Sequence, residues 1–199
     1  LTVAKAIKEK LPNENIVYLG DTARVPYGNK SRLLVTGYAN QITNFLLSEN
    51  AKLIVVACNT VSALSLPTLQ SEFQIPILGV IIPGSQAAIH ATRNKNIGVI
   101  GTIATINSNA YTAALNEIES SIQITTQACP LFVPLVEEGW LNGLVPSEIT
   151  ATYLKSINVA NVDTLILGCT HYPLLKPIIK DHVNDNTVLI DSAKTVAEE

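Results

Sequence analysis

The feature that most constrains the fold of this chain is a series of short aliphatic runs separated by longer amphipathic stretches. Each run is too short for a helix and is apolar on both faces, which is typical of strands in a parallel sheet covered by helices. The runs lie at residues 16–19, 53–57, 77–81, 97–100, 131–133, 165–167 and 188–190. We predict a strand at each of these positions.

The stretches between the runs have the spacing of amphipathic helices. Apolar side chains recur every three or four positions within residues 31–50 and again within residues 108–121. Strands that alternate with helices predict a doubly wound α/β fold, in which ligands bind beyond the carboxyl ends of the strands. The residues at strand ends are therefore the candidates for function.

The composition argues against several classes of function. Charged residues make up 15% of the 199 and the net charge is -3, so no basic stripe is available to bind nucleic acid. The apolar runs fall far short of the ~20 residues that cross a bilayer. Three cysteines, an odd number, fit free thiols in a reducing cytosol. We expect a cytoplasmic protein that binds neither nucleic acid nor membrane.

Two cysteines occupy matched positions in the sequence. Residues 54–60 (IVVACNT) and 165–171 (LILGCTH) each consist of an aliphatic strand, a small residue, a cysteine and polar residues. Each cysteine lies where the next helix begins, and the free amides there are expected to lower the thiol pKa from ~8.5 toward neutrality. Two opposed thiols can remove a proton from one face of a carbon and deliver one to the other. Cys58 and Cys169 are therefore predicted to invert a stereocentre on a small acid.

The polar residues beside the thiols have two interpretations. Asn59, Thr60 and Thr170 can accept hydrogen bonds from helix amides, or they can hold a substrate carboxylate beside those amides. His171 keeps a competing enzyme class open, a hydrolase in which Cys169 is the nucleophile and His171 its base. A non-catalytic module that binds an amino acid is a third possibility.

The cysteine spacing argues against a metal site. Zinc sites typically pair their ligands as Cys-x2-Cys, whereas the three cysteines of this chain are isolated from one another. Cys129, which precedes Pro130 and does not share the strand-end pattern, is predicted to be structural. The sequence contains neither a Gly-x-Gly-x-x-Gly fingerprint nor a phosphate loop, so we expect no nucleotide cofactor.

Three segments together resemble the signature segments of the glutamate racemase family. They are residues 20–28 (GDTARVPYG), 57–60 (ACNT) and 168–175 (GCTHYPLL), and residues 79–88, 98–108 and 129–139 resemble the family's intervening segments in the same order. The resemblance implies two similar doubly wound, three-layer αβα domains with the active site between them. We expect residues 1–82 with 190–199 to form the first domain and residues 83–189 to form the second.

The resemblance also implies the chemistry. It implies interconversion of L- and D-glutamate without metal or cofactor, supplying D-glutamate to bacterial peptidoglycan, by a cytoplasmic homodimer. Cys58 and Cys169 would be the acid/base pair, and His171 would tune Cys169. The implied substrate contacts are Tyr27, Gly28, Asn59, Thr60, Thr170 and His171. Asp21 and Glu137 would be helpers, although Asp21 could equally pair with Arg24.

The sequence departs from the family pattern at its ends. Family members carry an Asp-Ser-Gly-x-Gly-Gly turn upstream of the helix with which this chain opens, and they continue beyond Glu199. We therefore expect a fragment whose first domain lacks its N-terminal strand and whose own activity is weak or absent. An aspartate or other small-acid racemase and the cysteine hydrolase remain alternatives.

Overall fold

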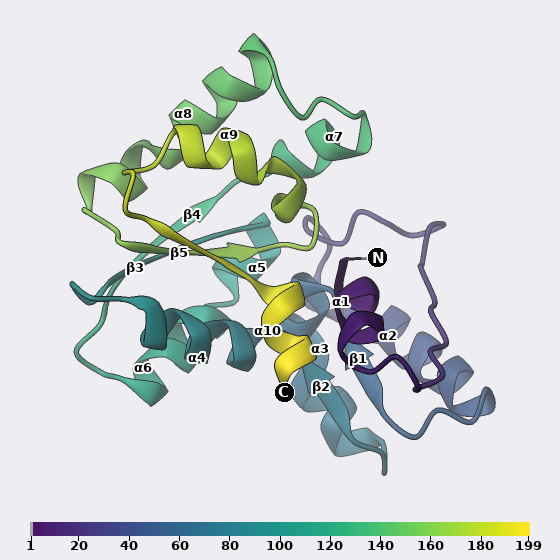
Figure 1. Ribbon diagram of the computed structural model, residues 1–199. Helices are drawn as coiled ribbons and strands as arrows, with labels where there is room; N and C mark the ends of the chain where they lie inside the picture. Colours follow the sequence, from purple (N-terminus) through teal and green to yellow (C-terminus); the bar gives the residue numbers. More distant parts are fainter. Residues whose placement is uncertain (1) are drawn as a thin grey trace.

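The computed structural model describes residues 2–199 and has an α/β architecture (Figure 1). Leu1, which we placed at the start of the first helix, lies outside the described residues. The helices are α1 Thr2–Lys10, α2 Arg32–Ser48, α3 Asn59–Glu72, α4 Ile81–Ala91, α5 Ile103–Asn107, α6 Ala110–Ile118, α7 Phe132–Glu137, α8 Leu144–Val159, the 3-10 helix η1 Tyr172–Leu175, α9 Lys176–Asp181 and α10 Ser192–Glu198.

Within residues 2–199 the strands form two parallel sheets. In the smaller sheet, β1 (Ile54–Val56) pairs with β2 (Ile77–Gly79). The larger sheet has the order β4-β3-β5-β6, and its strands are β3 Asn96–Gly101, β4 Gln123–Ala128, β5 Thr164–Gly168 and β6 Val188–Asp191. Every strand pair is parallel, so the predicted α/β class with parallel sheets is confirmed.

Helices cover both faces of the larger sheet (Figure 1). Leu165 and Leu167 of β5 belong to a buried cluster with Leu154 of α8 and Ile178 of α9. Ile166, between them in the sequence, belongs to the opposite cluster, which includes Tyr111 of α6. The strand is therefore buried on both faces, as expected for a central parallel strand, and its side chains alternate between two cores.

The sequence predicted most strands in the right place but erred at two runs. Residues 16–19 form no ladder, and Ile16, Val17 and Tyr18 are exposed. This segment has no regular secondary structure and pairs with no strand within residues 2–199, and three of its four side chains are exposed. The run at 131–133 is also not a strand, because α7 begins at Phe132 and buries that ring in the core.

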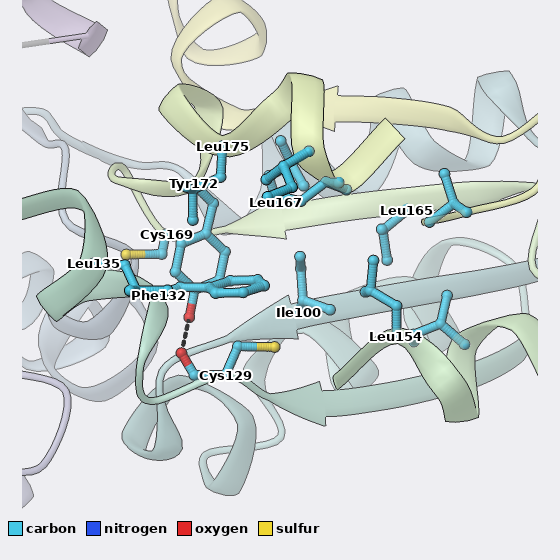
Figure 2. Close-up of a cluster of buried hydrophobic side chains, with 14 of the residues drawn as sticks. Ile100, Cys129, Phe132, Leu135, Leu154, Leu165, Leu167, Cys169, Tyr172 and Leu175 are labelled. Carbon is cyan, nitrogen blue, oxygen red and sulfur yellow. Dashed lines mark hydrogen bonds between the residues drawn. The ribbon is translucent and has the colours of Figure 1, made fainter. Parts of the chain in front are cut away.

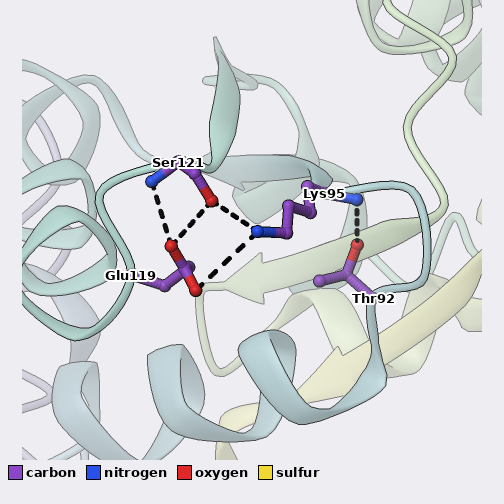
Figure 3. Close-up of polar contacts among 4 residues, drawn as sticks. All are labelled: Thr92, Lys95, Glu119 and Ser121. Atoms are coloured by element: carbon purple, nitrogen blue, oxygen red, sulfur yellow. Dashed lines mark hydrogen bonds and ion pairs between the residues drawn. The ribbon is translucent and has the colours of Figure 1, made fainter.

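A polar network closes the amino-terminal edge of β3 and β4 (Figure 3). The Lys95 ammonium donates to the Ser121 hydroxyl at 2.6 Å and lies 3.9 Å from the Glu119 carboxylate. Ser121 in turn donates to Glu119 at 2.7 Å, and the Lys95 amide donates to Thr92. These exposed contacts lie at the opposite end of the strands from the cysteines, so they support the sheet without entering the candidate site.

The first and last helices pack together. Val3 of α1 shares a small buried cluster with Val80 and with Ala193 and Val196 of α10. No helix within residues 2–199 is both long enough and apolar enough to cross a lipid bilayer.

Candidate active site

The carboxyl edge of the larger sheet is lined by small polar residues and thiols. Thr102, Cys129, Cys169 and Ser192 follow β3, β4, β5 and β6 directly, and parallel strands bring all four positions to one edge. The amino terminus of α3 is docked against this edge through Asn59 and Thr60. Cys58, the N-cap residue of α3, is thereby brought toward Cys169.

Cys58 lies at the helix start that the sequence predicted, but its electrostatics differ from the prediction. Burial raises the pKa of the Cys58 thiol, while hydrogen bonds from the amides of Val61 and Thr60 and from the Thr60 side chain oppose the rise. The expected pKa near neutrality is therefore wrong for this state of the site. Desolvation of a thiolate outweighs the favourable amides.

Cys169 is the more deeply buried of the pair. It lies in the turn between β5 and η1, and burial, followed by the charge of Cys58, raises its pKa to about 12, against opposing hydrogen bonds from the His171 and Tyr172 amides. This electrostatic coupling means that ionising one thiol disfavours ionising the other. Such a pair favours the state with at most one thiolate, which is the state that two-base proton transfer requires.

His171 connects Cys169 to an acidic residue. Its Nδ1 lies 3.7 Å from the Cys169 sulfur, and its Nε2 lies 2.5 Å from Oε1 of Glu137 at the end of α7. Thr170, between the thiol and the imidazole in sequence, is half-buried. The structure thus brings four of the predicted site residues, Cys169, Thr170, His171 and Glu137, into one corner.

The turn that carries Cys169 is anchored to the neighbouring strand end. The Tyr172 hydroxyl donates to the Cys129 carbonyl at 2.9 Å, and the ring of Phe132 meets Tyr172 edge-on with ring centroids 5.1 Å apart (Figure 2). Cys129 itself is fully buried in this cluster. Its predicted structural role is consistent with this packing.

Thr60 belongs to a buried group of three hydroxyls. Its Oγ1 lies 2.9 Å from that of Thr102 and 3.2 Å from that of Thr105, and the latter two lie 3.0 Å apart. Thr102 also caps α5 by accepting from the Thr105 amide. Thr102 and Thr105 were not predicted as site residues, although a glycine followed by hydroxyl-bearing residues after β3 was a usable signal.

Asn59 is held by side-chain contacts on both sides. Its Oδ1 accepts a 2.6 Å hydrogen bond from the Tyr111 hydroxyl, and its Nδ2 donates to Ser192 Oγ at 3.4 Å. All three side chains are buried. Tyr111 was predicted only as part of the amphipathic helix within residues 108–121.

Asp21 and Tyr27 form a second polar group, on the loop before α2. Arg24 Nε lies 2.7 Å from Asp21 Oδ2, and the Tyr27 hydroxyl donates to the same carboxylate. Although burial alone raises the pKa of Asp21, these hydrogen bonds bring it below its ordinary value. Asp21 is therefore a paired anion that orients Tyr27, which favours the Arg24 pairing weighed in the sequence analysis.

Gly28 approaches the carboxyl edge of the larger sheet very closely. A Cβ atom at this position would lie 2.6 Å from Cβ of Thr102, and the Gly28 carbonyl accepts from the Ala104 amide at 2.9 Å. The neighbour that requires glycine at this position is therefore Thr102. The loop carrying Asp21, Tyr27 and Gly28 is thus fixed against the same edge as the thiols.

A family model described as Asp/Glu/Hydantoin racemase matches residues 2–199. The chain belongs to this family. It is 50% identical over 197 residues to a glutamate racemase of Geobacter metallireducens, a match that covers 99% of this chain and 73% of that protein. The family assignment and the isomerase class inferred from the three sequence segments are confirmed.

Solved structures agree with this assignment. The fold matches the crystal structure of glutamate racemase isoform RacE1 from Bacillus anthracis with a TM-score of 0.96 and 41% identity, covering 99% of this chain and 74% of that one. It also matches a glutamate racemase from Francisella tularensis in complex with D-glutamate, with a TM-score of 0.93, 37% identity and coverage of 99% and 73%.

Proposed function

We propose that this chain interconverts L- and D-glutamate by proton transfer between Cys58, Cys169 and the α-carbon, with no metal or cofactor, and so supplies D-glutamate for peptidoglycan. The observation that carries the proposal is the docking of the α3 amino terminus on the carboxyl edge that holds Cys169. This docking supports a single site for both thiols, as does the contribution of the Cys58 charge to the raised pKa of Cys169. The family membership and the glutamate racemase relatives supply the reaction and the substrate.

The proposed reaction begins with the thiols protonated, because burial raises the pKa of both. His171, 3.7 Å from the Cys169 sulfur, takes the thiol proton, and Glu137 stabilises the resulting imidazolium. The Cys169 thiolate then removes the α-proton, and the electron pair of the broken C–H bond delocalises into the substrate carboxylate. The Cys58 thiol protonates the opposite face, and the proton held by His171 returns through solvent to Cys58.

The remaining residues have proposed roles in binding. Thr60, Thr170 and the nitrogen of Asn59 would donate hydrogen bonds to a substrate carboxylate beside the helix amides. Tyr27 and Gly28 would close the site from the loop before α2, with Asp21 positioning Tyr27. These groups are short and polar, as recognition of a small diacid requires.

The architecture of two domains with the site between them is part of the proposal. Residues 1–82 with 190–199 would form one domain and residues 83–189 the other. Support comes from the smaller sheet lying wholly in the first segment and from α10 packing on α1. The boundary at 190 divides β6, which pairs with β5, so this strand would connect the domains. A homodimer in the bacterial cytoplasm completes the proposal, and its three free cysteines suit that compartment.

The test is the formation of D-glutamate from L-glutamate. Chiral chromatography measures the product, and uptake of solvent deuterium at the α-carbon measures the proton exchange. Cys58→Ser and Cys169→Ser should each lower turnover by roughly 100-fold or more, since each removes one proton carrier. Cys129→Ala is the matched control and should retain turnover. Wild-type turnover in both serine variants would overturn the two-thiol mechanism.

The same assay separates the alternatives. Faster turnover of aspartate than of glutamate would assign the chain to the other substrate of this racemase class. A covalent adduct on Cys169, found by mass spectrometry of rapidly quenched reactions, would indicate the hydrolase instead. Proton transfer leaves no such adduct.

A further inference from the structure

We propose that Tyr111 is a positioning residue for both halves of this site, fixing the Asn59 carboxamide beside Cys58 and packing against the turn that carries Cys169. The inference rests on the proposed function. It assigns a role to a buried residue of α6 that the racemase reaction, as described above, does not use. Three observations carry it.

The first observation is the slot that holds the ring. Tyr111 is buried between α4 and β5, with Gly84 on one side and Gly168 on the other. A Cβ atom at Gly168 would lie 3.2 Å from Cε2 of Tyr111 and 2.7 Å from the Ile100 carbonyl, and one at Gly84 would lie 3.5 Å from the hydroxyl. The two glycines therefore leave the space that this phenol fills, and the ring touches the residue that precedes Cys169.

The second observation is the hydrogen-bonding arrangement of Asn59. Burial raises the pKa of the Tyr111 hydroxyl, so the phenol keeps its proton and donates it to Asn59 Oδ1 at 2.6 Å. This bond fixes the orientation of the carboxamide, with its oxygen toward Tyr111 and its nitrogen toward Ser192. Ser192 accepts one Nδ2 proton at 3.4 Å, and the second has no acceptor within residues 2–199. The amide thus presents a donor, which suits a substrate carboxylate.

The third observation is the link to both thiols. Asn59 is the first residue of α3 and follows Cys58 directly. The Tyr111 ring lies beside Gly168, which directly precedes Cys169, and a charge on Cys169 would further raise the pKa of the phenol. One side chain is therefore connected to the segments that carry the two proton carriers. A shift of Tyr111 would move the Asn59 donor relative to both.

The experiment compares Tyr111→Phe, Asn59→Ala and the double variant. Tyr111→Phe keeps the ring in its slot and removes only the donor, so KM for glutamate should rise roughly tenfold while kcat changes by less than about threefold. The double variant should be no worse than Asn59→Ala, because Tyr111 acts through Asn59. Tyr153→Phe is the matched control, since its hydroxyl bonds the Leu131 amide and its ring packs on Phe132.

The proposal would be overturned if the double variant lost as much kcat/KM as the product of the two single losses. It would also be overturned if Tyr111→Phe had the same kinetic constants as Tyr153→Phe. A second measurement does not depend on turnover. The Asn59 side-chain amide signals in a 15N-labelled sample should shift or double in Tyr111→Phe and stay unchanged in Tyr153→Phe. Unchanged Asn59 signals in Tyr111→Phe would overturn the positioning role. If turnover instead proved independent of Cys58 and Cys169, the proposed function would be overturned. The shift of the Asn59 amide signals in Tyr111→Phe would still stand as evidence for the positioning role.

Discussion

His171 is held by Glu137, whose carboxylate oxygen Oε1 lies 2.5 Å from Nε2 of the imidazole. The other ring nitrogen, Nδ1, lies 3.7 Å from the Cys169 sulfur. A proton on Nε2, directed at the carboxylate, leaves Nδ1 as the acceptor that faces the thiol. Glu137 therefore selects the tautomer in which His171 can serve as a base for Cys169.

Removal of His171 should impair catalysis far more than neutralisation of Glu137. His171→Asn should lower kcat by roughly 100-fold, within the range for a lost acid/base group. Glu137→Gln should lower it by at most about fivefold, because this exposed pair contributes roughly 0–1 kcal/mol. Glu138→Gln, at the exposed neighbouring position, is the control and should match the wild type. Equal kcat values for the His171 and Glu138 variants would contradict this account.

Gly28→Ala should destabilise the protein because its Cβ would lie 2.6 Å from Cβ of Thr102. The expected loss in the free energy of unfolding is about 1–3 kcal/mol, as for other overpacked sites. Gly37→Ala is the matched control, since nothing lies within 4 Å of its Cβ and the residue is inside α2. Because alanine has a higher helix propensity than glycine, Gly37→Ala should raise the free energy of unfolding by up to about 1 kcal/mol. Urea unfolding measures both, and a stabilising Gly28→Ala would show that the loop is not fixed on Thr102.

The stability of the protein should fall in alkali partly because of Cys169. Its pKa rises from 9.0 to about 12 on folding, so the folded state binds the proton more tightly than the unfolded chain does. This contribution is fully present below pH 9 and is lost progressively as the pH rises toward 12. Between pH 8 and 10.5 the wild type should therefore lose more unfolding free energy than Cys169→Ser. Parallel losses in the two proteins would refute the shift.

Alkylation should distinguish the three thiols by exposure. Cys58 is half-buried, whereas Cys169 is 7% exposed and Cys129 fully buried. Iodoacetamide at pH 8 should label Cys58 first and Cys129 only after unfolding, with all three slower than free cysteine because burial raises each thiol pKa. Timed peptide mapping gives the order, with a urea-unfolded sample as the reference for equal reactivity. Early labelling of Cys129 would be inconsistent with the packing around Tyr172.

The sequence predicted the strands and helices whose own pattern of apolar and polar residues is typical of that element. β3 and β5 are mostly aliphatic at their centres because helices cover both of their faces, and both were predicted. β4 was missed because its sequence, QITTQA, is polar and partly exposed at the edge of the sheet. Residues 131–133 have the composition of a strand. Phe132 instead begins helix α7, and its ring packs on Tyr172. Tertiary packing decides such short runs.

The sequence placed the two candidate cysteines at strand ends, but it did not predict their electrostatics. The two cysteine turns were visible because each joins a strand to a helix. The raised thiol pKa values depend on how deeply the turns are buried, which spacing does not encode. Thr102, Thr105 and Tyr111 reach the site through contacts across 42 to 52 residues of sequence, so no local pattern pointed to them together.

The Tyr172 hydroxyl joins the Cys169 turn to the segment that follows β4, the edge strand of the larger sheet. Because Tyr172 also packs edge-on against Phe132 in the same buried cluster, the position of the Cys169 turn depends on how the chain is packed beyond the end of β4. The geometry of this thiol is therefore set in part from the edge of the larger sheet, two strands away from β5.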